Sequence, residues 1–129
     1  MGITILGLGP GDFSLLTQEA EEVLGGAKEV YLRTIRHPAV DGLPAHLIIH
    51  SFDRIYEEKE TFAEVYEKIA EKVLELGRRP EGVVYIVPGH PFVGEESVSL
   101  IVTRAEEEGI PVRLVAGLSF LEAAFSQLR

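Results

Sequence analysis

The stretch Gly2–Leu8, which reads GITILGL, is a short run of β-branched residues and leucines that gives way to glycine and proline. An apolar run of this length, without polar alternation, is typical of a strand buried on both faces of a parallel sheet. Glycines and Pro10 end the run. We therefore predict a buried first strand here, followed by a loop over Gly9–Ser14.

Similar patterns continue along the chain. Further strands are predicted at Val30–Arg33, His46–Phe52, Gly82–Val87 and Pro111–Val115, with a loop over Thr34–Leu43. Apolar residues with a period of about 3.6 predict helices at Thr17–Ala27, Tyr56–Leu76 and Glu95–Glu108, and a last one from Ser119 onward. Because strands alternate with helices, we expect an α/β fold with a parallel sheet covered on both faces.

The composition is that of one globular domain without covalent cross-links. Of the 129 residues, 46% are hydrophobic, a fraction too high for a disordered chain. The absence of cysteine excludes disulfides, thiolate metal sites and a cysteine nucleophile. No apolar run approaches the roughly 20 residues that span a bilayer, and the first residues lack a signal-peptide pattern. We expect a soluble, cytoplasmic protein.

The charge balance argues against polyanionic partners. Twelve Lys and Arg residues stand against 21 Asp and Glu residues, which gives a formal net charge of −9. Such a chain is repelled by nucleic acid and by anionic membranes. We expect neither as a partner, although a local basic site for a small anion is still compatible with this balance.

Three glycine-rich loops follow predicted strands and form the candidate site. They are residues 7–12 (GLGPGD), 88–95 (PGHPFVGE) and 116–120 (AGLSF). In open parallel sheets, ligands bind beyond the carboxyl ends of the strands, where such loops gather. The sequence therefore places a ligand site at this edge of the sheet.

The first loop resembles the dinucleotide-binding fingerprint only in part. The third glycine of that fingerprint falls on Asp12, and the helix is predicted to begin near Thr17. A dinucleotide domain requires a helix that begins directly at Gly11. The alternative is a rigid turn, in which Pro10 fixes the backbone and the glycines adopt angles closed to other residues.

The second loop holds His90 between Pro88 and Pro91, which restrict the backbone on either side. A single histidine in a loop is more often a structural hydrogen-bonding group than a catalyst. The other histidines, at positions 37, 46 and 50, lie on or near other strands. We therefore expect no metal site.

The helix predicted at Tyr56–Leu76 carries many acidic residues, which have two interpretations. Glutamates such as Glu57, Glu58 and Glu64 are candidates for magnesium ligands, but such sites need carboxylates from facing helices. The other interpretation is a solvated face with pairs four residues apart, such as Glu64–Lys68. We favour the solvated face.

Taken in order, the three loops resemble the tetrapyrrole (corrin/porphyrin) methylase family of S-adenosylmethionine-dependent methyltransferases. Residues Ile3–Asp12 look like its first motif, and Val87–Pro91 takes the place of its Gly-Asp-Pro motif, with His90 where Asp is usual. Gly117–Phe120 is similar to its Gly-x-Ser-Ser segment, except that Phe120 replaces the second Ser.

Further residues look like one branch of that family. The stretch Leu32–Thr34 with His37–Pro38, and Ser51–Asp53 with Tyr56–Glu57, resemble the methylase-like domain at the N-terminus of MazG-type bacterial proteins. In those proteins the domain precedes a nucleoside triphosphate pyrophosphohydrolase domain. The resemblance covers the whole chain.

The resemblance implies a fold, a cofactor and a site. It implies a five-stranded sheet in the order 3-2-4-1-5, S-adenosylmethionine as cofactor, a small-molecule methyl acceptor and a homodimer. The cofactor-binding residues that it implies are Pro10, Gly89, His90, Gly94, Gly117 and Ser119. On the acceptor side it implies Thr34, Arg36, His37 and His90. No residue is assigned a catalytic role.

We expect residues 1–115 to form the methylase-like domain and residues 116–129 to begin the link to a second domain. On this expectation the chain is inactive alone, and Val115, Leu118, Leu121 and Phe125 expose apolar surface that favours self-association. An alternative from another class is a non-catalytic binding or regulatory module of a MazG-type nucleoside triphosphate pyrophosphohydrolase.

Overall fold

A computed structural model describes residues 1–92, 95–119, 121 and 125, and its strands form one parallel sheet. The strands are β1 (Ile3–Gly7), β2 (Glu29–Leu32), β3 (Ile48–Ser51), β4 (Val83–Val87) and β5 (Val112–Val115). Their order is β3-β2-β4-β1-β5, and every pair is parallel. The predicted fold class and strand order are confirmed.

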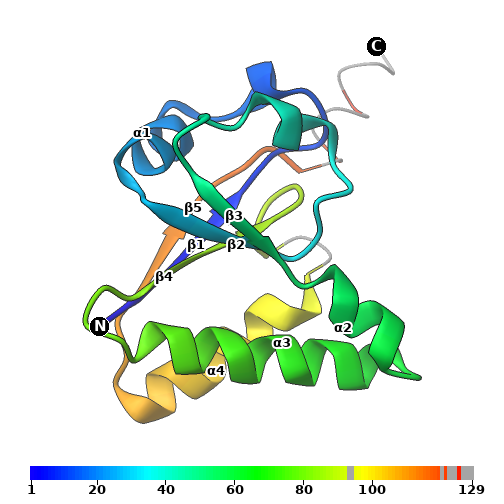
Figure 1. Ribbon diagram of the computed structural model, residues 1–129, viewed down its shortest axis with the longest axis vertical. Helices are drawn as coiled ribbons and strands as arrows, with labels where there is room; N and C mark the ends of the chain where they lie inside the picture. Colours follow the sequence, from blue (N-terminus) through cyan, green and yellow to red (C-terminus); the bar gives the residue numbers. More distant parts are fainter. Residues whose placement is uncertain (93–94, 120, 122–124, 126–129) are drawn as a thin grey trace.

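Helices cover both faces of this sheet (Figure 1). They are α1 (Gln18–Gly26), α2 (Asp53–Glu58), α3 (Phe62–Gly77) and α4 (Glu96–Glu108). Two short 3-10 turns lie in the regions predicted as loops: η1 (Phe13–Leu15), which extends one residue beyond the predicted loop, and η2 (Pro38–Gly42), which lies within it. In the view of Figure 1, α3 and α4 lie on one side of the sheet, and α1 and the two turns lie on the other. The predicted last helix falls largely outside the described residues.

The alternation of side chains along β1 shows why both faces are covered. Ile3 and Ile5 point into the cluster formed with α3 and α4, whereas Leu6 belongs to the cluster formed with α1. All three are at most 2% exposed. Burying an aliphatic side chain of this size contributes about 1.5–3 kcal/mol. The central strand is therefore apolar on both faces, as the GITILGL stretch predicts.

The prediction of one helix over Tyr56–Leu76 is wrong, because the chain forms two helices there. Helix α2 ends at Glu58, and Lys59 is extended. Thr61 is the N-cap of α3, and its hydroxyl oxygen accepts a hydrogen bond from the Glu64 N–H. The pattern Thr61-x-x-Glu64 is the sequence signature of a capping box, and it overrides the continuous apolar period.

The acidic face of α3 is solvated, but not through the predicted pair of Glu64 with Lys68. The Glu64 carboxylate accepts a hydrogen bond from the Glu60 N–H, and the Lys68 ammonium lies 3.7 Å from the Glu71 carboxylate. Glu67 instead forms an ion pair with Arg104 of α4. No helix in the described part of the chain is both long enough and apolar enough to cross a membrane.

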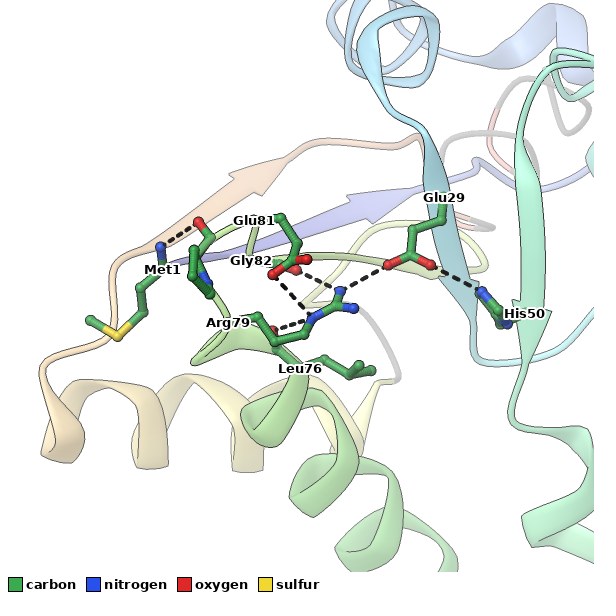
Figure 2. A network of polar contacts seen from close by, with 8 residues as sticks. Met1, Glu29, His50, Leu76, Arg79, Glu81 and Gly82 are labelled. Atoms are coloured by element: carbon green, nitrogen blue, oxygen red, sulfur yellow. Dashed lines mark hydrogen bonds and ion pairs between the residues drawn. The ribbon is translucent and has the colours of Figure 1, made fainter.

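At the amino ends of the strands, a polar network joins the two halves of the sheet (Figure 2). The Arg79 guanidinium donates to the Glu29 carboxylate at 2.9 Å and to the carbonyls of Leu76 and Gly82. The other Glu29 oxygen lies 3.1 Å from Nε2 of His50 on β3. The hydrogen bond from Arg79 outweighs desolvation and lowers the pKa of Glu29. This network ties β3 and β2 to the turn before β4.

The break before α3 generates a stability prediction. Replacing Thr61 by Ala removes the hydroxyl that caps the Glu64 N–H, and should lower the free energy of unfolding by about 1 kcal/mol. Thr103 is the matched control, because it is exposed within α4 and Thr103→Ala should leave stability unchanged or slightly higher. Urea unfolding followed by circular dichroism measures both. Equal stability in the two variants would contradict the capping role.

Candidate functional site

The register of the sheet brings the starts of the three glycine-rich loops to one level. Gly7, the last residue of β1, pairs with Val87 at the end of β4. Leu6 pairs with Val115 at the end of β5. Because β4, β1 and β5 are neighbours, loops that lie far apart in the sequence leave the sheet side by side. This is the edge at which the sequence places the ligand site.

A backbone bridge joins the first two loops. The Gly9 N–H donates to the Gly89 carbonyl at 3.2 Å, and the Gly89 N–H donates to the Gly9 carbonyl at 2.9 Å. Both residues have a positive φ, +79° at Gly9 and +64° at Gly89. Side chains are disfavoured in that region, so this bridge requires glycine on both sides. The rigid-turn interpretation of the first loop is supported.

The third loop packs against the same bridge without any intervening side chain. A Cβ atom at Gly7 would lie 2.2 Å from the Gly89 carbonyl oxygen, and one at Gly117 would lie 2.3 Å from that same atom. Either distance is far below a van der Waals contact. The missing side chains of Gly7 and Gly117 are thus required by the protein's own backbone. A Cβ atom at Gly89 would make only ordinary van der Waals contacts, 3.9 Å from the Leu118 carbonyl oxygen and 3.9 Å from Cα of Ser119, so it is the positive φ that favours glycine there.

His37 is built into this junction. Its Nε2 lies 2.9 Å from the Gly9 carbonyl oxygen, and its Nδ1 accepts a hydrogen bond from the Ala39 N–H. A carbonyl oxygen has no proton to give, so Nε2 carries the proton and donates. Both ring nitrogens therefore serve the fold, one fixing the first loop and one capping η2.

Asp53, which begins α2, holds the segment that contains two of the predicted acceptor-side residues. The Thr34 hydroxyl donates to one Asp53 oxygen at 2.6 Å, and the Ile35 N–H donates to the other at 2.9 Å. The Arg36 N–H in turn donates to the Thr34 hydroxyl oxygen. Desolvation raises the pKa of Asp53, but these hydrogen bonds, one involving Ser51, and the charge of Arg36 together outweigh it and lower the pKa.

The remaining predicted residues lie around the second and third loops. Nδ1 of His90 accepts a hydrogen bond from the Phe92 N–H, which fixes the ring against its own loop. Ser119 is buried, and its hydroxyl oxygen accepts from the Leu121 N–H. Pro10 is half-buried next to the Gly9–Gly89 bridge. Gly94 lies outside the described residues.

Sequence reasoning missed a buried polar network beside these loops. The Tyr85 hydroxyl lies 2.8 Å from the Ser97 hydroxyl, which donates to the Glu95 carboxylate at 2.8 Å. The other Glu95 oxygen lies 3.1 Å from Nε of Arg33, and Arg33 also donates to the Tyr56 hydroxyl. The available signal was the tyrosine inside the apolar run of β4, because a buried hydroxyl needs a partner.

Burial dominates the electrostatics of that network. Desolvation raises the pKa of Glu95 despite the opposing charge of Arg33 and the hydrogen bond from Ser97. The pKa of Tyr85 is raised well above its ordinary value, mainly by burial and also by the charge of Glu95. Within the described residues, no cluster of three or more histidines and carboxylates is arranged to hold a metal ion.

The geometry corrects two sequence-based expectations. A dinucleotide site needs a helix that begins at Gly11, but α1 begins at Gln18 after a single 3-10 turn, so that alternative is wrong. Val115 was expected to be exposed and is fully buried, because it faces the cluster beneath α1. The exposed apolar residues of this region are instead Leu118, Leu121 and Phe125.

Together these features define a parallel α/β domain whose candidate site consists of loops tied backbone to backbone at the carboxyl ends of its central strands. Such a domain is found in enzymes that bind a small ligand at this edge. The chain belongs to the tetrapyrrole (corrin/porphyrin) methylases, whose family model matches residues 2–129.

The chain is also similar to two curated proteins and to a solved structure. The uncharacterized protein YabN of Bacillus subtilis (strain 168) is 44% identical over 98% of the chain, and siroheme synthase 1 of Halorhodospira halophila (strain DSM 244 / SL1) is 31% identical over 96%. The chain spans 26% and 25% of their lengths, about a quarter of each. The native form of uroporphyrin III C-methyl transferase from Thermus thermophilus superimposes with a TM-score of 0.69 at 25% identity, covering 96% of this chain and 48% of that one.

The glycine junction generates a stability prediction. Gly7→Ala places a methyl group against the Gly89 carbonyl and should lower the free energy of unfolding by about 2–3 kcal/mol. Gly25→Ala, near the end of α1, meets nothing within 4 Å and should raise it by about 0.5–1 kcal/mol. Calorimetric melting of both variants checks this. Tolerance of the Gly7 substitution would show that the loops do not approach as closely as described.

A pH-dependence follows from the lowered pKa of Asp53. Its contribution to stability is present above its unfolded-state pKa, about pH 4, and is lost as the pH falls through the lowered folded-state value. Asp53→Asn should therefore cost about 1 kcal/mol at pH 7, and its difference from the wild type should shrink below pH 4. Asp41→Asn, at an exposed aspartate of η2, is the control and should match the wild type throughout. Urea unfolding curves, recorded at steps of about one pH unit between pH 3 and 7, measure the difference in unfolding free energy between each variant and the wild type. A stability difference between Asp53→Asn and the wild type that does not change with pH would contradict the stabilising role of the Asp53 carboxylate.

Proposed function

We propose that the chain is the N-terminal half of a two-domain S-adenosylmethionine-dependent methyltransferase, and that it contributes the loops after β1, β4 and β5 to the cofactor site. The observation that carries the proposal is the convergence of these loops at one edge of the sheet, joined by the Gly9–Gly89 bridge. Membership of a methylase family supports it.

The chemistry of the loops fits this cofactor. None of the three loop sequences contains Lys or Arg, so a sulfonium cation meets no like charge there, whereas a phosphate group would find no fixed positive charge. Gly89 has no side chain to shield its main-chain atoms, so a ligand could approach them more closely than at other residues. His90 follows Gly89 in the chain and offers Nε2, the ring nitrogen that does not accept from Phe92.

When bound, S-adenosylmethionine supplies an electrophilic methyl group for an in-line displacement by the acceptor. The chain's own contribution is positioning, which accelerates such transfers by holding donor and acceptor aligned. Gly89, His90 and Ser119 lie on the cofactor side of the proposed site. Thr34 and Arg36 lie on the acceptor side, where Asp53 fixes their segment.

The finer proposal concerns the branch of the family and the assembly. Several residues that resemble MazG-type proteins contact one another: Arg33 with Tyr56, and Thr34 with Asp53. This mutual contact supports the proposal that they form one unit specific to that branch, with a small-molecule methyl acceptor. The exposed side chains of Leu118, Leu121 and Phe125 support the further proposal of a homodimer.

Isothermal titration calorimetry with S-adenosylhomocysteine tests the proposed cofactor. A longer protein that includes this chain should bind it. The 129-residue chain should bind weakly, because the proposed cleft lies between this domain and a second one. In the longer protein His90→Ala should weaken binding about fivefold, the value of one hydrogen bond. His46→Ala, whose ring contacts the Ala27 carbonyl at the opposite end of the sheet, is the matched control. No heat from the longer protein at millimolar ligand would refute the proposal and favour a non-catalytic module.

A further inference from the structure

The buried network beside the second loop contains an ion pair that fold stability does not explain. The side chain of Glu95 is 4% exposed and that of Arg33 is 22% exposed. Nε of Arg33 has no partner with hydrogen-bond geometry, although it lies 3.1 Å from the Glu95 carboxylate. Two well-packed apolar residues usually stabilise a buried site as well as such a pair does, or better.

The pKa of Glu95 points in the same direction. Burial raises it more than the charge of Arg33 and the hydrogen bond from Ser97 lower it. The contacts of the carboxylate therefore do not fully offset its loss of hydration. A group that is retained at a net cost in its ionised form calls for an explanation other than fold stability.

The place of the two residues in the chain supplies that explanation. Arg33 immediately precedes Thr34, at the start of the segment that leads to His37. Glu95 is the last residue of the second loop and the N-cap of α4. The Arg33–Glu95 ion pair therefore joins one end of the segment that leads to His37 to one end of the loop that holds His90.

Their other ends meet at Gly9. Its carbonyl oxygen accepts from the Gly89 N–H and from Nε2 of His37. The two segments are thus tied to each other twice, at Gly9 through the backbone and at Arg33–Glu95 through charge. Two ties at separate points fix both the distance between the segments and their relative orientation.

We propose that Arg33 and Glu95 are positioning residues, whose ion pair sets the spacing between the segment after β2 and the loop after β4 and thereby shapes the ligand site between them. The ligand part of this inference rests on the proposed function. The positioning part does not, because it concerns the order of the loop in the free protein.

The network beyond the pair supports a positional role. The single proton of the Ser97 hydroxyl goes to Glu95, so the Tyr85 hydroxyl must donate to Ser97. These two hydrogen bonds, from Tyr85 to Ser97 and from Ser97 to Glu95, orient one Glu95 carboxylate oxygen from the fully buried centre of β4. On the other side, the Arg33 guanidinium is held by the Tyr56 hydroxyl of α2 at 2.9 Å. Both charged groups are therefore fixed from rigid elements, a requirement for precise positioning.

The test replaces the whole pair rather than one partner. The double variant Arg33→Met, Glu95→Leu removes both charges and fills the space with apolar atoms, which costs little stability. It also leaves the buried Ser97 hydroxyl without its acceptor, so its melting temperature should fall by about 5 °C or less. Its control is Arg78→Met, Glu108→Leu, which removes an exposed ion pair between the end of α3 and the end of α4. Two readouts follow: hydrogen exchange of the Phe92 amide, which is bonded to His90, and the affinity of the longer protein for S-adenosylhomocysteine.

The expected result is about tenfold faster exchange at Phe92 and about tenfold weaker ligand binding in the Arg33/Glu95 variant, with exchange at amides in the centre of the sheet much less affected. The Arg78/Glu108 variant should match the wild type in both readouts. Unchanged exchange at Phe92 would overturn the proposal, as would losses that only follow a drop in global stability. If the wild type does not bind the ligand, the proposed function fails, while the exchange readout still decides the positioning role.

A second variant covers the case in which the double variant does not fold. Glu95→Gln keeps the shape and a hydrogen-bond acceptor for Ser97, and removes only the charge facing Arg33. It should change exchange at Phe92 in the same direction by a smaller factor, about threefold. Exchange at the wild-type rate in this folded variant would mean that the ion pair does not position the loop.

Discussion

The close approach of three backbone segments at the carboxyl ends of β1, β4 and β5 is the constraint on which the rest of the site depends. Gly7 and Gly117 both pack against the Gly89 carbonyl, with no room for a Cβ atom at either position. The Gly9–Gly89 bridge then joins the loops by two hydrogen bonds. A side chain at this junction would separate the segments, so the shape of the site is decided by backbone and not by side-chain packing.

Side chains complete what the backbone begins. His37 and Asp53 tie the segment after β2 to the first loop and to α2, and Arg33 and Glu95 tie it to the second loop. Sequence reasoning assigned His37 to the acceptor side and placed Arg33, Asp53 and Glu95 in its motifs or loops, but it did not predict these contacts. In the free protein these contacts are structural, whereas Nε2 of His90 takes no part in the hydrogen bond with Phe92. The proposed function accordingly assigns ligand contacts to His90 and Arg36.

Much of the fold could be predicted, because the strands and the loops that follow them have clear local sequence patterns. The apolar runs marked all the strands, and the glycines at the end of β1 and after β4 and β5 marked the site. The error at Tyr56–Leu76 came from following the apolar period through Lys59 and overlooking the Thr61-x-x-Glu64 capping box. The Arg33–Glu95 pair was not predictable, because its partners are 62 positions apart in the sequence. They meet only because β2 and β4 are adjacent strands in the sheet.

The sequence by itself determined the class of fold, the position of the loops and the family, since alternating apolar runs and glycines act locally and do not need the rest of the chain. Only the tertiary structure decided what the glycines and histidines do. Whether Gly117 faces a ligand or another loop, and whether His37 is free or bonded on both nitrogens, depends on which strands are neighbours. Strand order is set by packing across the whole sheet, and no single stretch of residues encodes it.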